Sequence, residues 1–132
     1  KEPYYDLLEN AMKAYNDTTI PINSNTSSSD NYRKAKDYFI QYRQTAPITD
    51  DFYPTATLYL AISHLEIQES AQAILLLASL TQQNFPQQVD AQWYLALSYI
   101  KTKQTEKAIP ILKDLAQTKY QAKATVILKE LQ

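Results

Sequence analysis

Few residues in this chain of 132 residues have the chemistry of a metal site or a catalytic nucleophile. The sequence contains one histidine, His64, and neither cysteine nor glycine. Without cysteine it can form no disulfide and no thiolate metal site, and without glycine it cannot form a glycine-rich phosphate loop. His64 and Glu66 lie two positions apart and would not face the same side of a helix. We therefore expect His64 to be a packing residue and expect no metal or cofactor.

Adjacent carboxylates are the remaining candidates for acid–base catalysis. Asp50 and Asp51 precede a predicted helix, and Asp90 lies near the start of another. At these places a carboxylate accepts bonds from free backbone N–H groups and interacts favourably with the helix dipole. The sequence also lacks a Gly-x-Ser-x-Gly nucleophile motif. We therefore interpret these acids as helix caps and expect the chain not to be an enzyme.

The charge of the chain argues against two further classes of partner. Thirteen Lys and Arg residues against fourteen Asp and Glu residues give a net charge of -1, whereas nucleic-acid binding needs a basic surface. No apolar run approaches the ~20 residues that span a membrane, so we expect no membrane insertion by these residues. The charges are uneven, because residues 44–100 contain no Lys or Arg. We interpret this distribution as a solvated surface.

The elements that carry these residues are predicted to be helices. Apolar residues recur at three- and four-residue spacing, and the absence of glycine disfavours tight β-hairpins. A polar segment rich in Ser, Thr and Asn, residues 16–30, interrupts the pattern and predicts a mobile surface loop. The predicted helices cover residues 3–16, 31–45, 54–68, 70–83, 87–102, 105–117 and 120–131.

An internal repeat organises these helices. The segment Tyr59-Leu-Ala-Ile-Ser-His-Leu65 aligns with Tyr94-Leu-Ala-Leu-Ser-Tyr-Ile100 at a shift of 35 residues, and the alignment continues without a gap into the following helix. A first unit aligns less closely, because the loop at 16–30 contains an insertion between its two helices. A unit of this length made of two helices predicts a stacked array of helix pairs.

The repeat resembles the tetratricopeptide family, through Trp93, Leu95-Ala96, Tyr99 and Ala108. The resemblance implies an all-α, right-handed α-α superhelix, with small residues where two helices approach closely. We expect a single domain over residues 1–132. Its helix pairs would cover residues 3–45, 54–83 and 87–117, and a C-terminal capping helix would cover residues 120–131.

A second apolar stripe recurs on the first helix of each pair. In the family, these positions line a concave groove that receives a peptide or a neighbouring helix. The stripe consists of Leu8, Met12 and Tyr15, then Leu58, Ile62 and Leu65, then Trp93, Leu97 and Ile100. Glu66 and Lys101 occupy equivalent positions beyond the last two triplets and are expected at the rim of the groove. These residues are the predicted binding site.

The expected function is a protein–protein interaction scaffold that holds an apolar or amphipathic peptide in its concave groove. One alternative is a structural or oligomerisation domain, whose groove is filled in cis or by a homodimer partner. Loosely, the arrangement also resembles the helical-repeat portions of bacterial envelope proteins anchored by a membrane helix elsewhere in the chain. That resemblance implies a spacer domain and a periplasmic location.

Overall fold

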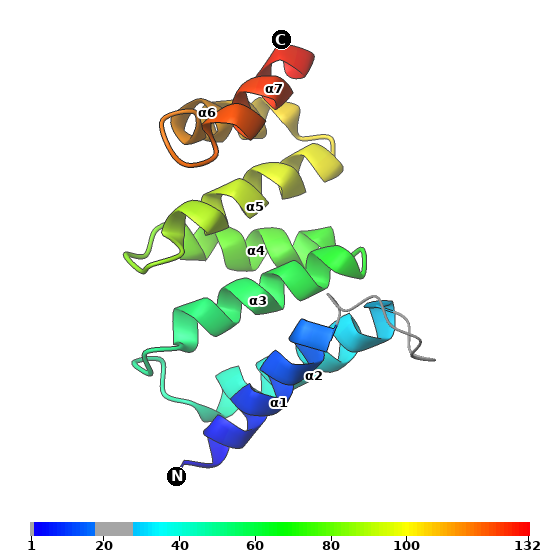
Figure 1. Ribbon diagram of the computed structural model, residues 1–132, viewed down its shortest axis with the longest axis vertical. Helices are drawn as coiled ribbons and strands as arrows, with labels where there is room; N and C mark the ends of the chain where they lie inside the picture. The colour runs from blue at the N-terminus through cyan, green and yellow to red at the C-terminus, as the bar shows by residue number, and fades with distance from the viewer. Residues whose placement is uncertain (1, 18–27) are drawn as a thin grey trace.

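The structure is a computed structural model that describes residues 2–17 and 28–132. The described part of the chain forms seven α-helices and contains no β-strand, as the sequence predicts (Figure 1). The helices are α1 (Pro3–Asp17), α2 (Ser28–Thr45), α3 (Tyr53–Glu66), α4 (Ser70–Leu80), α5 (Gln88–Lys101), α6 (Thr105–Leu115) and α7 (Gln121–Leu131). Most of the predicted inserted loop, residues 18–27, lies outside the described residues, and its two ends continue α1 and begin α2.

The helices stack in chain order, with the two ends of the chain at opposite ends of the molecule (Figure 1). Each helix packs mainly against its neighbours in sequence. In addition, the backbone of α3 approaches those of α1 and α5, whereas among the described residues the backbones of α2, α4 and α6 do not approach one another in this way. The odd-numbered helices α1, α3 and α5 are therefore closer together and form the inner side of the stack. The even-numbered helices form its outer side.

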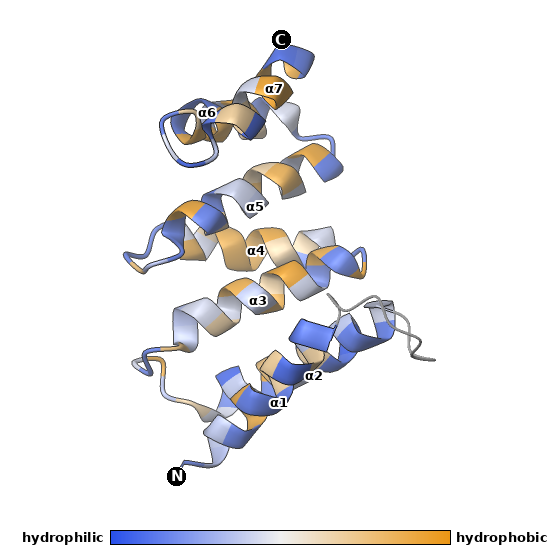
Figure 2. Cartoon of the chain, in the orientation of Figure 1, coloured by the Kyte–Doolittle hydropathy of each residue, from blue (hydrophilic) through white to orange (hydrophobic). Residues whose placement is uncertain are grey.

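Alanines lie at the places where the helices approach most closely. Ala61, Ala73, Ala96 and Ala108 are completely buried, as the repeat alignment predicts for its small-residue positions. A short side chain at these positions lets two helix backbones come close together, and larger apolar side chains fill the remaining space. Figure 2 shows apolar residues concentrated along α4 and the facing parts of α3 and α5.

The helix ends explain how the chain turns without glycine. Pro54 is in the first turn of α3. Backbone N–H groups in the first turn have no partner within the helix, so the N–H that proline lacks costs no helical hydrogen bond. Helices α3 and α5 each end in a Schellman motif, in which the N–H of Glu69 bonds to the His64 carbonyl and that of Gln104 to the Tyr99 carbonyl. These turns fix the direction in which α4 and α6 leave the preceding helix.

Candidate functional site

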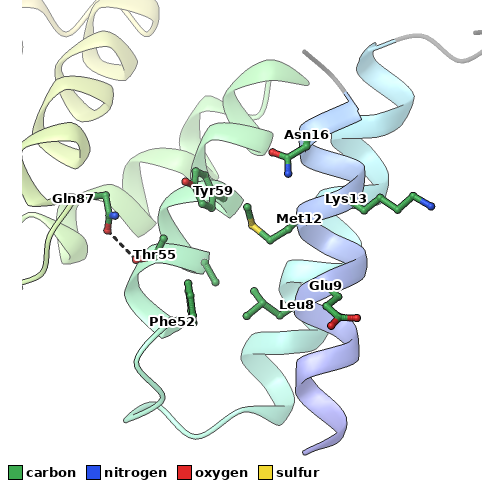
Figure 3. A pocket seen from close by; sticks show the side chains of 10 residues that line it. Leu8, Glu9, Met12, Lys13, Asn16, Phe52, Thr55, Tyr59 and Gln87 are labelled. Carbon is green, nitrogen blue, oxygen red and sulfur yellow. Dashed lines mark hydrogen bonds between the residues drawn. The ribbon is translucent and has the colours of Figure 1, made fainter. Parts of the chain in front are cut away.

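A pocket of about 530 Å³ opens on the inner side of the stack between α1 and α3. Leu8 and Met12, one helical turn apart on α1, point into it from one side (Figure 3). Ala56 and Tyr59 of α3 line the opposite side. Because residues four apart lie on the same face of a helix, Leu8 and Met12 form a continuous apolar wall. This pocket, called the inner pocket below, is the candidate binding site.

Polar groups surround the apolar floor of the inner pocket. The Thr55 hydroxyl donates to Gln87 Oε1 at 2.9 Å, which ties the start of α3 to the turn before α5. Glu9, Lys13 and Asn16 of α1 also line the pocket, and in Figure 3 the Lys13 side chain extends away from it. A mostly apolar recess with a few polar groups at its edge is suited to an amphipathic ligand.

Phe52 is the most exposed aromatic residue at the inner pocket. It lies in the linker before α3, and 54% of its surface is accessible. A large exposed apolar side chain beside a pocket marks an interaction surface when other apolar groups adjoin it. The predicted stripe does not include Phe52. It also omits three other residues that line the pocket, Thr55, Tyr59 and Gln87. The signal that could have found Phe52 is a large aromatic residue in a short polar linker.

Tyr15, the third member of the first predicted triplet, does not line the inner pocket. Its ring packs against Tyr59 with centroids 4.8 Å apart and contacts Phe39 and Tyr32 edge-on. Burial raises the pKa of the Tyr15 hydroxyl above its ordinary value. Tyr15 therefore supports the wall of the pocket through Tyr59, and the expectation that it lines an open groove is wrong.

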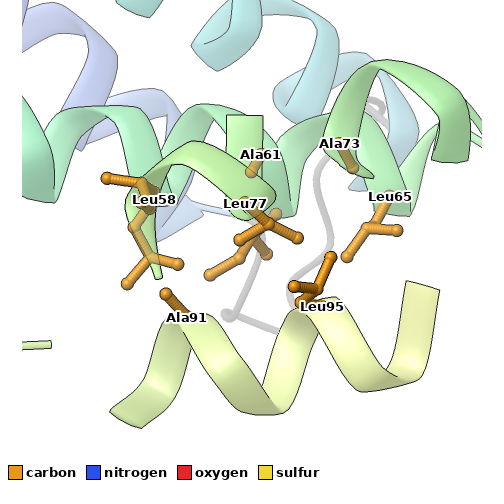
Figure 4. Packing of buried hydrophobic residues seen from close by; sticks show 9 residues of the cluster. Leu58, Ala61, Leu65, Ala73, Leu77, Ala91 and Leu95 are labelled. Carbon is orange, nitrogen blue, oxygen red and sulfur yellow. The ribbon is translucent and has the colours of Figure 1, made fainter. Parts of the chain in front are cut away.

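The second triplet lies in the hydrophobic core. Leu58, Ile62 and Leu65 are all buried, in one cluster with residues of α4 and α5. Figure 4 shows Leu58 and Leu65 facing Ala91 and Leu95 of α5. The expectation of an open groove along α3 is therefore corrected, because the next inner helix covers this face. Glu66, at the end of α3, is exposed.

The third triplet is largely covered as well. Trp93 is only 9% exposed and stacks on Tyr120 of the turn before α7, with ring centroids 4.9 Å apart and planes within 9°. Leu97 and Ile100 are half-buried and pack against the cluster of α5, α6 and α7. The expectation that Trp93 lies in a groove is wrong, because Tyr120 and α7 occupy that space. Lys101 is exposed at the end of α5.

Asp90 has a role that its position at a helix start does not reveal. It lies in the first turn of α5, but the expectation that it caps the helix is wrong, because the N-cap residue is Gln87 and no side chain caps this end. The Asp90 carboxylate instead accepts a hydrogen bond from the Tyr120 hydroxyl. Lys119 Nζ lies 2.8 Å from the same carboxylate. Burial, followed by the bond to Asp90, raises the pKa of Tyr120. These contacts join the start of α7 to the start of α5. The two residues of the hydrogen bond are 30 positions apart, and a single sequence does not indicate which residues pair over such a separation.

His64 is buried, as predicted, and it forms part of an ionic junction. Its Nδ1 lies 2.8 Å from Glu69 Oε1, and Lys36 Nζ lies 3.4 Å from the same oxygen. The bond to His64, with Lys36 as a further cause, lowers the pKa of Glu69 below its ordinary value, against the opposing effect of burial. The junction links α2, α3 and the start of α4.

Neither metal-binding nor membrane-spanning features are found in the described residues. No three or more His, Asp or Glu side chains within residues 2–17 and 28–132 are grouped so that they could hold a metal ion. None of the described helices is long and apolar enough to cross a membrane.

Comparison with known proteins identifies one of the helix pairs. A family model described as tetratricopeptide repeat matches residues 90–118, which include most of α5 and all of α6. This stretch is therefore similar to a tetratricopeptide repeat. No curated protein and no solved structure matches the chain. The α3–α4 pair aligns with the matched repeat at a shift of 35 residues, and the described chain has the fold of a tetratricopeptide-like solenoid.

The tetratricopeptide match also gives a general functional class. Repeats of this family are typically non-catalytic protein-interaction domains that bind proteins or peptides. The match therefore indicates a protein-interaction scaffold.

Proposed function

We propose that residues 1–132 act as one tetratricopeptide-like module that binds a short apolar or amphipathic segment of a partner protein in the inner pocket. The observation that carries the proposal is the recess itself: of the three predicted triplets, the one on α1 contributes side chains to an open pocket. Its volume of about 530 Å³ lies within the ~300–1,000 Å³ of typical ligand pockets.

The composition of the inner pocket supports an amphipathic ligand. Leu8, Met12 and Phe52 offer aliphatic, thioether and aromatic contacts, and methionine adapts its shape to ligands of different outline. Thr55 and Gln87 hold each other at the far edge, where a ligand backbone would find hydrogen-bonding groups. In this proposal Leu97 and Ile100 stabilise the stack, and the exposed Glu66 and Lys101 lie outside the pocket.

Selection of peptides from a random displayed library tests this function. We expect wild-type protein to enrich peptides with apolar residues at helical or alternating spacing, and Met12→Gln to weaken their binding by about tenfold, the effect of losing a modest interface anchor. Isothermal titration with the enriched peptides measures the loss.

Val126→Gln is the matched control, because Val126 is 57% exposed on α7 and lines neither the inner pocket nor any other recess described here. It replaces one apolar residue by the same polar one without touching the inner pocket, and peptide affinity should be unchanged. Peptides that bind Met12→Gln and the Leu8→Gln, Met12→Gln double variant as tightly as wild type would refute the proposal. Failure to enrich any peptide on wild type over the double variant would refute it equally.

A further inference from the structure

The outer side of the stack carries a second recess, which the interaction site proposed above does not use. It lies where the end of α2, the linker 46–52, the start of α3 and the second half of α4 meet, and its volume is about 230 Å³. Ile48, Leu75 and Arg43 line it together with Tyr53. We call this recess the outer groove.

The outer groove holds the two most exposed large apolar side chains among the described residues. Ile48 is 77% exposed and Leu75 is 76% exposed, although they come from the linker and from α4. Single exposed apolar residues are ordinary, but two that border one recess form a contiguous apolar surface of the kind that marks an interaction site. A cavity of ~150 Å³ holds a benzene-sized group, so the outer groove has room for an aliphatic side chain.

Arg43 places a positive charge at this recess. Its guanidinium carbon lies 5.3 Å from the centre of the Tyr53 ring, which holds the side chain in place by a cation–π contact. No ion pair found among the described residues includes Arg43, and its Nε–H is buried without an acceptor. Arg43 is partly exposed, and a carboxylate pairs with an exposed guanidinium group through charge-assisted hydrogen bonds.

The acidic residues of the linker do not neutralise this charge. Asp50 accepts hydrogen bonds from the Tyr42 hydroxyl and from the Phe52 backbone N–H, and neither Asp50 nor Asp51 lines the groove. Arg43 is the only charged residue among those that line the groove. The groove is therefore an apolar surface with one cationic end.

We propose that the outer groove binds a peptide segment in which an aliphatic side chain is followed by an acidic side chain, Asp or Glu. The aliphatic group packs between Ile48 and Leu75. The carboxylate pairs with the guanidinium group of Arg43. The site is separate from the inner pocket and allows the module to hold two partner segments at once.

A displayed library of short peptides, in which an aliphatic pair is followed by a randomised position, tests the proposal. We expect wild-type protein to enrich Asp or Glu at that position. Synthetic peptides from the selection, measured by fluorescence anisotropy, should lose about tenfold or more in affinity for Arg43→Gln and for Ile48→Ser. Replacing the peptide acid by its amide should weaken binding to wild type and leave binding to Arg43→Gln unchanged.

Two controls separate this site from the inner pocket and from misfolding. Met12→Gln, in the inner pocket, should bind the selected acidic peptides as wild type does, so the failure of either site leaves the other testable. Circular dichroism checks that each variant is folded. Because Ile48 is exposed, Ile48→Ser remains informative even if Arg43→Gln unfolds.

The proposal is overturned by any of four results. Two concern the selection: wild-type protein enriches no peptide, or the enriched peptides lack an acid. The third is peptide binding that does not depend on Arg43 and Ile48. The fourth is self-association of the protein, measured by light scattering, that Leu75→Ser abolishes. The last result would assign the outer groove to a second copy of the chain. The selected peptide and its C-terminal amide should bind equally well, because the proposed acid is a side chain.

Discussion

Gln68 and Lys103 occupy equivalent positions after α3 and α5 and have positive φ angles of 65° and 61°. This left-handed conformation is costly for residues with a Cβ, by roughly 1–2 kcal/mol, and glycine avoids the cost. The two Schellman turns require it, because the following N–H must reach back to the helix carbonyl. In the tetratricopeptide family, which the repeat resembles, this turn position often has glycine, and the positive φ angles of Gln68 and Lys103 explain that preference.

Glycine at either position should therefore stabilise the fold. We expect Gln68→Gly and Lys103→Gly each to raise the free energy of unfolding by about 0.5–1 kcal/mol, after the greater entropy of the unfolded glycine chain is subtracted. Urea denaturation followed by circular dichroism measures the change. Gln41→Gly is the control, since Gln41 is an exposed residue within α2, and it should lower the stability by about 1 kcal/mol. Destabilisation by all three would contradict the argument.

At the scale of the elements, α5 shows why a helix with two apolar stripes has no open groove. One stripe packs on the preceding pair through Ala91 and Leu95. The other, which includes Trp93, is covered by Tyr120 and α7. Lys123 Nζ lies 5.9 Å from the Trp93 ring, so a cation also faces the indole. Helix α7 thus closes the stack by using the surface that the family resemblance assigned to a ligand.

Trp93→Ala should consequently be a core truncation. We expect it to lower the free energy of unfolding by about 3–5 kcal/mol, because it removes the stacked ring and leaves a cavity between α5 and α7. Chemical denaturation followed by far-ultraviolet circular dichroism is suitable, since Trp93 is the sole tryptophan and fluorescence would be lost. Leu97→Ala, at a half-buried position on the same helix, should cost clearly less. Equal losses would show that α7 does not protect Trp93 in solution.

At the scale of the whole molecule, the Lys36–Glu69–His64 junction joins the first helix pair to the second. Glu69 is the shared acceptor, and the lowered pKa of its carboxyl group means that folding favours the ionised form. This contribution to stability is present above the ordinary pKa of 4.5 and is lost as the pH falls through the lowered folded value. The loss thus occurs in acid and leaves neutral pH unaffected.

Glu69→Gln provides the corresponding test. We expect the variant to be less stable than wild type at pH 7, and the difference in free energy of unfolding to shrink as the pH is lowered below 4.5. Denaturation at a series of pH values, followed by Trp93 fluorescence, gives this difference directly. The other carboxyl groups are the same in both proteins, so their contributions to the pH dependence cancel. Glu130→Gln, exposed on α7, is the control. If the difference in free energy of unfolding grew as the pH was lowered, the pKa of Glu69 would be raised by folding and the prediction would be wrong.

The sequence by itself determined the helices, their pairing and the places of closest approach. Apolar spacing predicted each of the seven helices found in the described residues. It could do so because a 3.6-residue period is a local property of the sequence and does not depend on which element packs beside the helix. The shift of 35 residues placed Ala61 on Ala96 and Ala73 on Ala108, and all four are buried. The sequence also predicted that His64 is a packing residue. It did not predict the bond between His64 and Glu69, because the two residues lie on opposite sides of a turn and no periodic pattern connects them.

Only the tertiary structure decided which of the recurring apolar stripes stays open. The triplets on α1, α3 and α5 look alike in sequence, but a stripe is open or buried according to the helix that lies beside it. Helix α5 covers Leu58 and Leu65, and α7 with Tyr120 covers Trp93. Between α1 and α3 a recess remains, into which Leu8 and Met12 project. Local periodicity records that a face is apolar, and only the packing of distant segments determines what covers it.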